Sequence, residues 1–372
     1  MTVWHRFAHK ALLFIGSSLV LCAAFAQQVP WHLDSPRANP QAAPAAINVW
    51  GVQPGPHRVV VALIDSGVLS AHPALEGRLL PGFDMQSGLN NLRGQRSELS
   101  EPERANLNCR DRAVSPGYRT HGTEVASLIA GNGYDNVWGV NPKAFILPIR
   151  VVGPCPMTRS DIHDAMAWAA GLDVPGVPFN PNPADILNIS FSGGSFECAS
   201  STQEMVNRIL AKGIFVVAAV GNSFGKRLQE PANCQGVISV GAVNALLEVE
   251  GYSAFDERTT LYAPGGGPRI NRPETWALNR LRVATEIMPG HANPELKGQD
   301  RGVGSSFAAP IVSGFLALLK SQRPHFGPDE FAKNLDEFTK QTIVDHKTRE
   351  CPCFIRTLYL QRRDEWTSSP TR

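Results

Sequence analysis

The chain has 372 residues, with 35 Lys and Arg against 33 Asp and Glu, so its formal net charge at pH 7 is +2. This even balance argues against a nucleic-acid binder that works by counterion release and against a polybasic protein of the membrane surface. With 43% apolar and 18% charged residues, the chain is neither disordered nor fibrous. We therefore expect a globular protein of one or two domains.

The first 26 residues have the layout of a secretory signal peptide. Arg6 and Lys10 precede an apolar run over residues 11–25, and Ala24 and Ala26 supply the small residues before a cut. The run is short for a membrane-spanning helix, and an uncleaved anchor is the alternative. Cleavage near Ala26 predicts a secreted or periplasmic protein with 33 charges of each sign.

The cysteines fit an exported protein. Cys22 would leave with the signal peptide, and the six that remain suggest three disulfides, whose pairing the spacing alone leaves open. No zinc motif fits their spacing well. The six are Cys109, Cys155, Cys198, Cys234, Cys351 and Cys353.

Residues 27–46 are rich in Pro and Ala, and we expect them to form an arm ahead of a single domain over residues 47–372, with a C-terminal extension from about residue 340. In the domain, apolar runs typical of buried strands alternate with stretches of helical periodicity. This alternation predicts an α/β fold, a doubly wound parallel β-sheet with helices on both faces. Residues 85–120 and 265–300 are polar and predicted to be irregular loops. The expected strands are 58–64, 144–152, 184–190, 214–220 and 237–243, and the expected helices are 121–130, 161–170, 201–212, 306–320 and 328–338.

Catalytic groups in such a sheet lie at the carboxyl ends of its strands. Asp65 follows the first strand, His121 opens a helix, and Ser306 lies in the first turn of an apolar helix. Each has an ordinary structural explanation when taken alone, as an Asx turn, a surface histidine or a helix cap. Together they are the carboxylate, base and hydroxyl that nucleophilic acyl transfer needs.

The order Asp, His, Ser, within Asp65-Ser-Gly, His121-Gly-Thr and Gly304-Ser-Ser-Phe-Ala-Ala-Pro310, resembles the subtilisin-like serine peptidases, the subtilase family. The resemblance runs from about residue 47 to 331. It implies a serine endopeptidase in which Ser306 is the nucleophile, His121 the base and Asp65 the group that orients the base. The order Asp, His, Ser counts against an α/β-hydrolase esterase, whose triad follows the order Ser, Asp, His.

Further matches carry the resemblance to other parts of the site. Asn222 ends an apolar strand where the family places its oxyanion donor, with the Ser306 N–H as the second donor. Asn188-Ile-Ser-Phe-Ser-Gly-Gly194 resembles the strand that pairs with an extended substrate. The substrate-binding residues that this match implies are Ser190, Phe191, Ser192 and Gly193. Glu230, near the pocket for the residue before the cut, is a candidate for favouring a basic side chain.

Arg150-Val-Val-Gly-Pro-Cys155 is similar to a stretch in the bacterial secreted branch of the family. That branch implies pairing of Cys109 with Cys155 and of Cys198 with Cys234. By exclusion, Cys351 pairs with Cys353.

Three positions depart from the family's usual pattern. Glu124 stands where relatives usually have His, Ser127 where they have Gly, and Ser305 where they have Thr. None of these changes removes a catalytic group, so we expect activity. The alternative is a catalytically impaired subtilisin-like protein that binds peptides or assists export.

The resemblance implies a protein or peptide substrate, no nucleic acid and no required cofactor, and we expect a monomer. Calcium is common in the family, but no stretch of this sequence has the ligand spacing of a calcium site or of any other metal site. The short distance from residue 26 to the domain leaves no room for a folding pro-domain, so a helper or inhibitor acting in trans is a further expected partner. The acids of the loop over residues 83–120 are Asp84, Glu98, Glu101, Glu103 and Asp111, and they lack ligand-like spacing.

Overall fold

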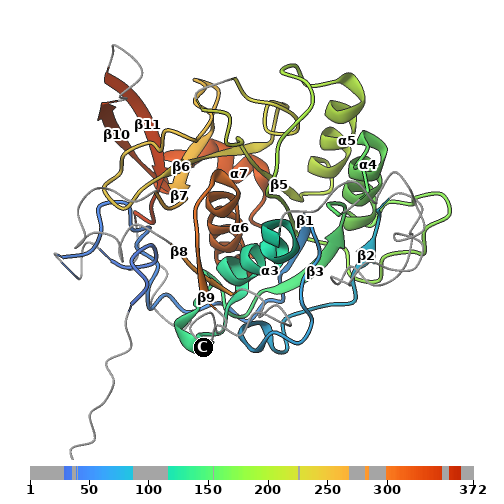
Figure 1. The fold of residues 1–372 in the computed structure, drawn as a ribbon, viewed down its shortest axis with the longest axis horizontal. Coiled ribbons are helices and arrows are strands. Elements are labelled where there is room, and N and C mark those ends of the chain that lie inside the picture. Colours follow the sequence, from blue (N-terminus) through green and yellow to red (C-terminus); the bar gives the residue numbers. More distant parts are fainter. Residues whose placement is uncertain are drawn as a thin grey trace, which may run out of the picture.

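The computed structural model describes residues 29–35, 39, 41–86, 116–153, 155–224, 227–267, 281–284, 299–345 and 352–361. Its main sheet has nine strands in the order β10-β11-β7-β6-β5-β4-β1-β3-β2 (Figure 1). All neighbours pair in parallel except β10 and β11, which form an antiparallel hairpin. The strands are β1 (Val60–Asp65), β2 (Phe83–Asp84), β3 (Phe145–Arg150), β4 (Ile186–Ile189), β5 (Phe215–Ala219), β6 (Ile238–Val243), β7 (Leu261–Pro264), β10 (Thr339–Asp345) and β11 (Pro352–Leu358). A separate antiparallel pair joins β8 (Leu281–Ala284) to β9 (Gln299–Gly302).

Helices cover both faces of the sheet, as the alternation predicts. The α3 (Pro116–Ala130) and α6 (Ser305–Gln322) helices pack on one face, and α4 (Arg159–Ala169) and α5 (Ser200–Leu210) on the other (Figure 1). Alternate residues of β1 point to the two faces, with Val61 in one hydrophobic cluster and Ala62 in the other. This burial on both sides explains why the strand is a continuous apolar run. The described residues also form the short α7 (Pro328–Lys333) and 3-10 turns at Pro73–Leu75, Tyr134–Asn136 and Leu335–Glu337.

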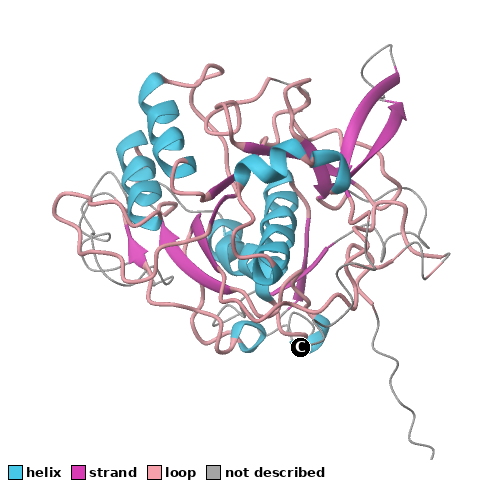
Figure 2. Cartoon of the chain, turned by 180° about the vertical axis from the view of Figure 1, so that it is seen from behind, coloured by secondary structure: helices cyan, strands magenta, loops and turns pink. Residues whose placement is uncertain are grey.

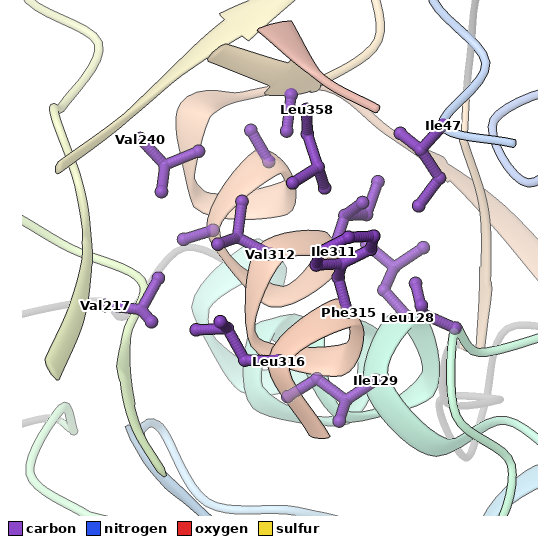
Figure 3. Packing of buried hydrophobic residues seen from close by; sticks show 14 of the residues in the cluster. Ile47, Leu128, Ile129, Val217, Val240, Ile311, Val312, Phe315, Leu316 and Leu358 are labelled. Carbon is purple, nitrogen blue, oxygen red and sulfur yellow. The ribbon is translucent and has the colours of Figure 1, made fainter. Parts of the chain in front are cut away.

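The α6 helix is the centre of the larger hydrophobic cluster. Its residues are apolar on nearly every side, a pattern typical of a helix buried in a core. Ile311 and Phe315 lie toward α3, while Val312 and Leu316 lie toward β5 and β6 (Figure 3). Because Ser306 is the second residue of this helix, a deeply packed element of the fold carries the predicted nucleophile.

The boundaries of several helices differ from the sequence predictions. The α3 helix begins at Pro116, so His121 lies inside it instead of opening it. The α4 helix begins at Arg159, two residues before the predicted start, because Thr158 and Asp161 form a reciprocal capping box. The predicted helix over 328–338 stops at Lys333 and continues only as a 3-10 turn.

The sequence also left several strands unpredicted. The β2 and β7 strands are too short to show a periodicity, and β8 lies within the stretch that was predicted to be irregular. The hairpin of β10 and β11 projects from the sheet (Figure 2), and Thr357 pairs with Tyr262 of β7. The predicted C-terminal extension therefore contributes two strands to the main sheet.

The described part of the N-terminal arm packs into the core. Trp31, Leu33 and Ile47 belong to the larger hydrophobic cluster. Backbone hydrogen bonds join Ile47 O to Leu360 N at 3.1 Å and Ala45 N to Ala245 O at 3.2 Å. Ile47 directly follows the arm, so its bond holds the end of the arm beside the segment that follows β11, and the Ala45 bond joins the arm to the loop after β6.

One predicted disulfide is present. Cys198 is bonded to Cys234, with their Cα atoms 5.1 Å apart. Cys155 is also disulfide-bonded, but Cys109 and Cys351 lie outside the described residues, so the other two pairings stay predictions. Within the described residues, none of the helices combines the length and apolarity needed to cross a membrane.

His32, in the arm, makes the free energy of unfolding of the protein sensitive to acid. Its side chain is 1% exposed, its Nε2 has no hydrogen-bond partner among the described residues, and burial lowers its pKa to about 3. Between pH 6.5 and 3, the unfolded chain binds a proton there that the folded chain does not. The free energy of unfolding should therefore fall with decreasing pH, by about 1.4 kcal/mol per unit from this group.

Urea unfolding between pH 7 and 4 tests this prediction. His32→Leu cannot titrate and should lose stability less steeply than the wild type, whereas His57→Leu, at an exposed site, should follow the wild type. If the free energy of unfolding fell with decreasing pH equally steeply in the wild type and in His32→Leu, the prediction would be wrong.

Candidate active site

Asp65 and His121 are hydrogen-bonded at the carboxyl edge of the sheet. Asp65 is the last residue of β1 and is 1% exposed. The His121 Nδ1 atom lies 2.8 Å from Asp65 Oδ1 and 3.0 Å from Oδ2, and the Ser66 N–H also donates to Oδ1. A carboxylate can only accept, so Nδ1 carries the proton and Nε2 is left as the basic nitrogen.

The first turns of α3 are held against the loop that follows β1. Gly122 N donates to Ser66 Oγ at 3.0 Å, and Leu69 N donates to Thr123 Oγ1 at 3.0 Å. A Cβ on Gly122 would lie 2.1 Å from Gly67 O, so only glycine fits at this position. The residues that flank the predicted base and carboxylate therefore bring the two side chains together.

The environment of His121 favours its protonated form. Burial alone would lower its pKa, but the charge and hydrogen bond of Asp65, together with the charge of Glu124, outweigh burial and raise the pKa. The side chain is 22% exposed, so its ring reaches the surface of the site. A neutral histidine whose pKa is raised in this way accepts a proton more readily and holds it as an imidazolium beside the buried carboxylate.

Ser306 lies at the N-terminus of α6, directly after Ser305. The first N–H groups of a helix have no acceptor within it, so the Ser306 N–H is free of intrahelical bonding. Gly304 precedes the helix with φ 154°, and its N–H donates to Gly265 O at 2.9 Å. This bond fixes the entry to the helix and so the place of the Ser306 hydroxyl.

Asn222 faces the same space as Ser306. Its Oδ1 accepts hydrogen bonds from Ser305 N at 3.0 Å and from Ser305 Oγ at 2.9 Å, which turns the Nδ2 donor the other way. A Cβ on Gly304 would lie 3.0 Å from Ser306 Oγ and 3.2 Å from Asn222 Nδ2. The hydroxyl and the amide donor therefore border one small volume, which glycine leaves open.

The predicted nucleophile and base also lie near each other. The ring of Phe307, the residue after Ser306, packs on the His121 ring with 5.6 Å between centroids. Among the described contacts, no hydrogen bond joins Ser306 Oγ to the His121 ring. Such bonds are often long without substrate and shorten when it binds.

Sequence reasoning missed two residues that support the site. Ser305 was noted only as a departure from the family pattern, yet its hydroxyl also accepts from Gly221 N at 3.1 Å and so links α6 to the end of β5. Tyr252 donates to the carbonyls of Gly265 and Gly266, beside the loop that holds Gly304. A serine beside the nucleophile was a usable signal, whereas nothing in the sequence marked Tyr252.

The predicted substrate-binding stretch follows β4. Ser190 is buried, and its hydroxyl accepts from Asn188 Nδ2 at 2.9 Å, while Asn188 Oδ1 accepts from Ser313 of α6 at 2.8 Å. Phe191 packs partly on the second hydrophobic cluster. Gly193 N donates to Glu230 O at 3.0 Å, which ties the stretch to the segment before Pro231.

The carboxylate of Glu230 is already engaged. One oxygen accepts from Ala199 N at the start of α5, and the other lies 3.3 Å from Arg159 Nη2. A carboxylate that caps a helix and pairs with an arginine has little charge left for a substrate. These contacts do not support the prediction that Glu230 favours a basic residue.

No described group of His, Cys, Asp and Glu side chains is arranged to hold a metal ion. Of the predicted acids, Asp84 pairs instead with Arg150 at 2.7 Å, and both side chains are buried. The others, Glu98, Glu101, Glu103 and Asp111, lie outside the described residues. The described residues therefore locate no calcium site among the predicted acids.

Comparisons with known proteins agree with this geometry. The model of the Subtilase family (Peptidase_S8) matches residues 57–357. The chain belongs to the subtilase family. Two similar relatives are the "Extracellular basic protease" of Dichelobacter nodosus, 31% identical over 76% of this chain and 46% of the relative, and the "Extracellular protease" of Xanthomonas campestris, 33% identical over 71% and 44%. This subtilase chain spans about half the length of these curated relatives.

Solved structures give the same assignment of the fold. A protease structure from Pseudoalteromonas arctica matches with a TM-score of 0.68 and 30% identity, over 84% of this chain and 90% of that one. A cold-adapted subtilisin-like serine proteinase matches with a TM-score of 0.58 and 21% identity, over 81% of this chain and 88% of that one. The predicted α/β fold is therefore confirmed as that of a subtilase.

Glu124 gives this subtilase a testable pH signature. Its charge is one of the causes that raise the pKa of His121, so Glu124→Gln should lower that pKa. An NMR titration of the His121 ring measures the shift directly, without any need for catalysis. Glu257→Gln, at an exposed position, should leave the pKa of His121 in place. An unchanged or raised pKa in Glu124→Gln would contradict the account.

Proposed function

We propose that this chain is a serine endopeptidase with Ser306 as nucleophile, His121 as general base and Asp65 as the group that orients His121. The observation that carries the proposal is the hydrogen bond of His121 Nδ1 to the buried Asp65, on the same edge of the sheet as the start of α6. Membership of the subtilase family and the names of the protease relatives support it.

In the acylation step, Ser306 Oγ attacks the scissile carbonyl carbon while its proton passes to His121 Nε2. The imidazolium is stabilised by Asp65, whose carboxylate stays ionised. When the C–N bond breaks, the proton moves from Nε2 to the leaving amine. Water then attacks the acyl ester with His121 again as base, which releases the acid and restores Ser306.

The negative oxygen of the tetrahedral intermediate is held by Asn222 Nδ2 and the Ser306 N–H. Both donors are oriented before substrate arrives, Asn222 by Ser305 and the N–H by the helix start. Donors that need no reorganisation stabilise the transition state more than the ground state. The substrate backbone pairs along residues 190–193, as extended peptides do at strand edges.

The same proposal covers location and partners. The signal peptide pattern of residues 1–26 and the printed names of the extracellular relatives support a secreted or periplasmic enzyme that acts on proteins or peptides. That the enzyme works as a monomer stays a prediction. Subtilases need no organic cofactor. A structural calcium ion and a helper or inhibitor in trans are compatible with the proposal, and the described residues locate neither.

Labelling with a fluorophosphonate tests the proposal. The wild type should be modified at Ser306, found by mass spectrometry, and Ser306→Ala should not be modified. A folded wild type that resists the reagent would contradict the enzyme function and favour the alternative of a catalytically impaired peptide-binding protein.

Asn222 and Ser305 should act together on the rate. Asn222→Ala removes one oxyanion donor and should lower kcat by about 100- to 1,000-fold with little change in KM. Ser305→Ala should lower kcat less than Asn222→Ala does, because Asn222 keeps its Nδ2 donor and loses only the hydroxyl that orients it. Ser305→Thr keeps a hydroxyl at this position and should have a kcat close to that of the wild type. Steady-state kinetics on one peptide measures all three. Equal kcat in the wild type and Asn222→Ala would contradict the assignment.

A further inference from the structure

Two neighbouring strands end beside the nucleophile. The β4 and β5 strands pair in parallel, with Ile189 opposite Ala218, so the chain leaves both at the same edge. Residues 190–194 follow β4 and residues 220–222 follow β5, and Ser192 of the first segment lies against Gly221 of the second. We call the boundary between these two segments the acyl gap, because Asn222 of the second segment borders the volume next to Ser306 Oγ.

Ser192 reaches across the acyl gap. A Cβ on Gly221 would lie 2.3 Å from Ser192 Oγ and 3.6 Å from Ser192 Cβ, so the hydroxyl rests against the opposite wall. This oxygen is buried and has no hydrogen-bond partner among the described residues. A buried hydroxyl without a partner is uncommon, and the missing bond suggests that another group supplies it.

The place of the gap shows which part of a substrate would fill it. The attacked carbonyl carbon must lie at Ser306 Oγ, with its oxygen toward Asn222 Nδ2. The side chain of the residue that contributes this carbonyl, the acyl residue, then projects beside Gly221 and toward Ser192. The opposite end of the gap approaches Glu230. A Cβ built on Gly194 would lie 3.9 Å from Glu230 Oε2, and Arg159 holds this carboxylate in place.

We propose that Ser192 sets the acyl specificity of this enzyme by narrowing the acyl gap. The enzyme then prefers substrates with a short acyl side chain, and among these a hydroxyl side chain that bonds Ser192 Oγ. This inference rests on the proposed function and specifies its substrate class. A long side chain would have to displace the hydroxyl, and one extra methylene in a tight pocket changes rates about 10-fold or more.

A set of peptides that differ only in the acyl residue, Ala, Ser or Phe, tests the inference. The wild type should cleave the Ala and Ser peptides with a kcat/KM at least about tenfold above that for the Phe peptide. Ser192→Gly and Ser192→Ala should raise the Phe to Ala ratio about tenfold, and Ser192→Ala should also lose the preference for Ser over Ala. Ser192→Thr keeps the hydroxyl and adds a methyl group, so it should keep the preference for Ser over Ala and should not raise the Phe to Ala ratio.

Ser195→Ala is the matched control, because Ser195 lies in the same loop and its hydroxyl accepts from Glu197 N. It should leave the ratios unchanged. Ratios in Ser192→Gly and Ser192→Ala that stay at the wild-type value, or a wild type that prefers Phe, would overturn the inference.

A binding measurement separates this inference from the proposed function. In a Ser306→Ala background, calorimetry with the same peptides reports the acyl gap without catalysis. Tighter binding of the Ser peptide than the Phe peptide, reversed by Ser192→Gly, supports the inference even if fluorophosphonate labelling fails. Labelling at Ser306 with no effect of Ser192 on binding overturns the inference and leaves the proposed function in place.

Discussion

The contact between Gly122 and the Ser66-Gly67 turn is the constraint on which the site depends. Gly122 lies so close to Gly67 O that no side chain fits between them, and its N–H is bonded to Ser66 Oγ. This contact presses α3 onto the end of β1 and sets the His121 ring over Asp65. A buried carboxylate is costly unless hydrogen bonds satisfy it, and the same contact brings the donor that it needs.

The other half of the site depends on one hydroxyl. Ser305 donates to Asn222 Oδ1 and accepts from Gly221 N, so it joins the start of α6 to the end of β5. Since α6 is surrounded by the core, its N-terminus is a rigid platform. The proposed nucleophile and oxyanion donor therefore lie on two elements that one serine connects, and the base lies on a third that packs against α6.

The parts of the fold that the sequence predicted are those with strong local patterns. The β1 strand and α6 are continuous apolar runs, and Asp65, His121 and Ser306 lie in short motifs whose glycines the packing requires. The parts that it did not predict depend on contacts distant in sequence. The hairpin of β10 and β11 pairs with β7, and the end of the arm lies beside Leu360. Neither the hairpin nor the arm has a periodicity of its own that would predict this contact. The partners of Glu230, which are Arg159 and Ala199 N, likewise come from elsewhere in the chain and leave no local pattern around it.

The central claim is that Ser306, His121 and Asn222 are arranged around one reacting carbonyl. A crystal structure with a peptide boronic acid tests it most directly, because boron adopts the tetrahedral geometry of the intermediate. We expect boron bonded to Ser306 Oγ, with one boronate oxygen within hydrogen-bond distance of both Asn222 Nδ2 and the Ser306 N–H. Boron bonded to another residue, or an oxygen turned away from Asn222, would contradict it.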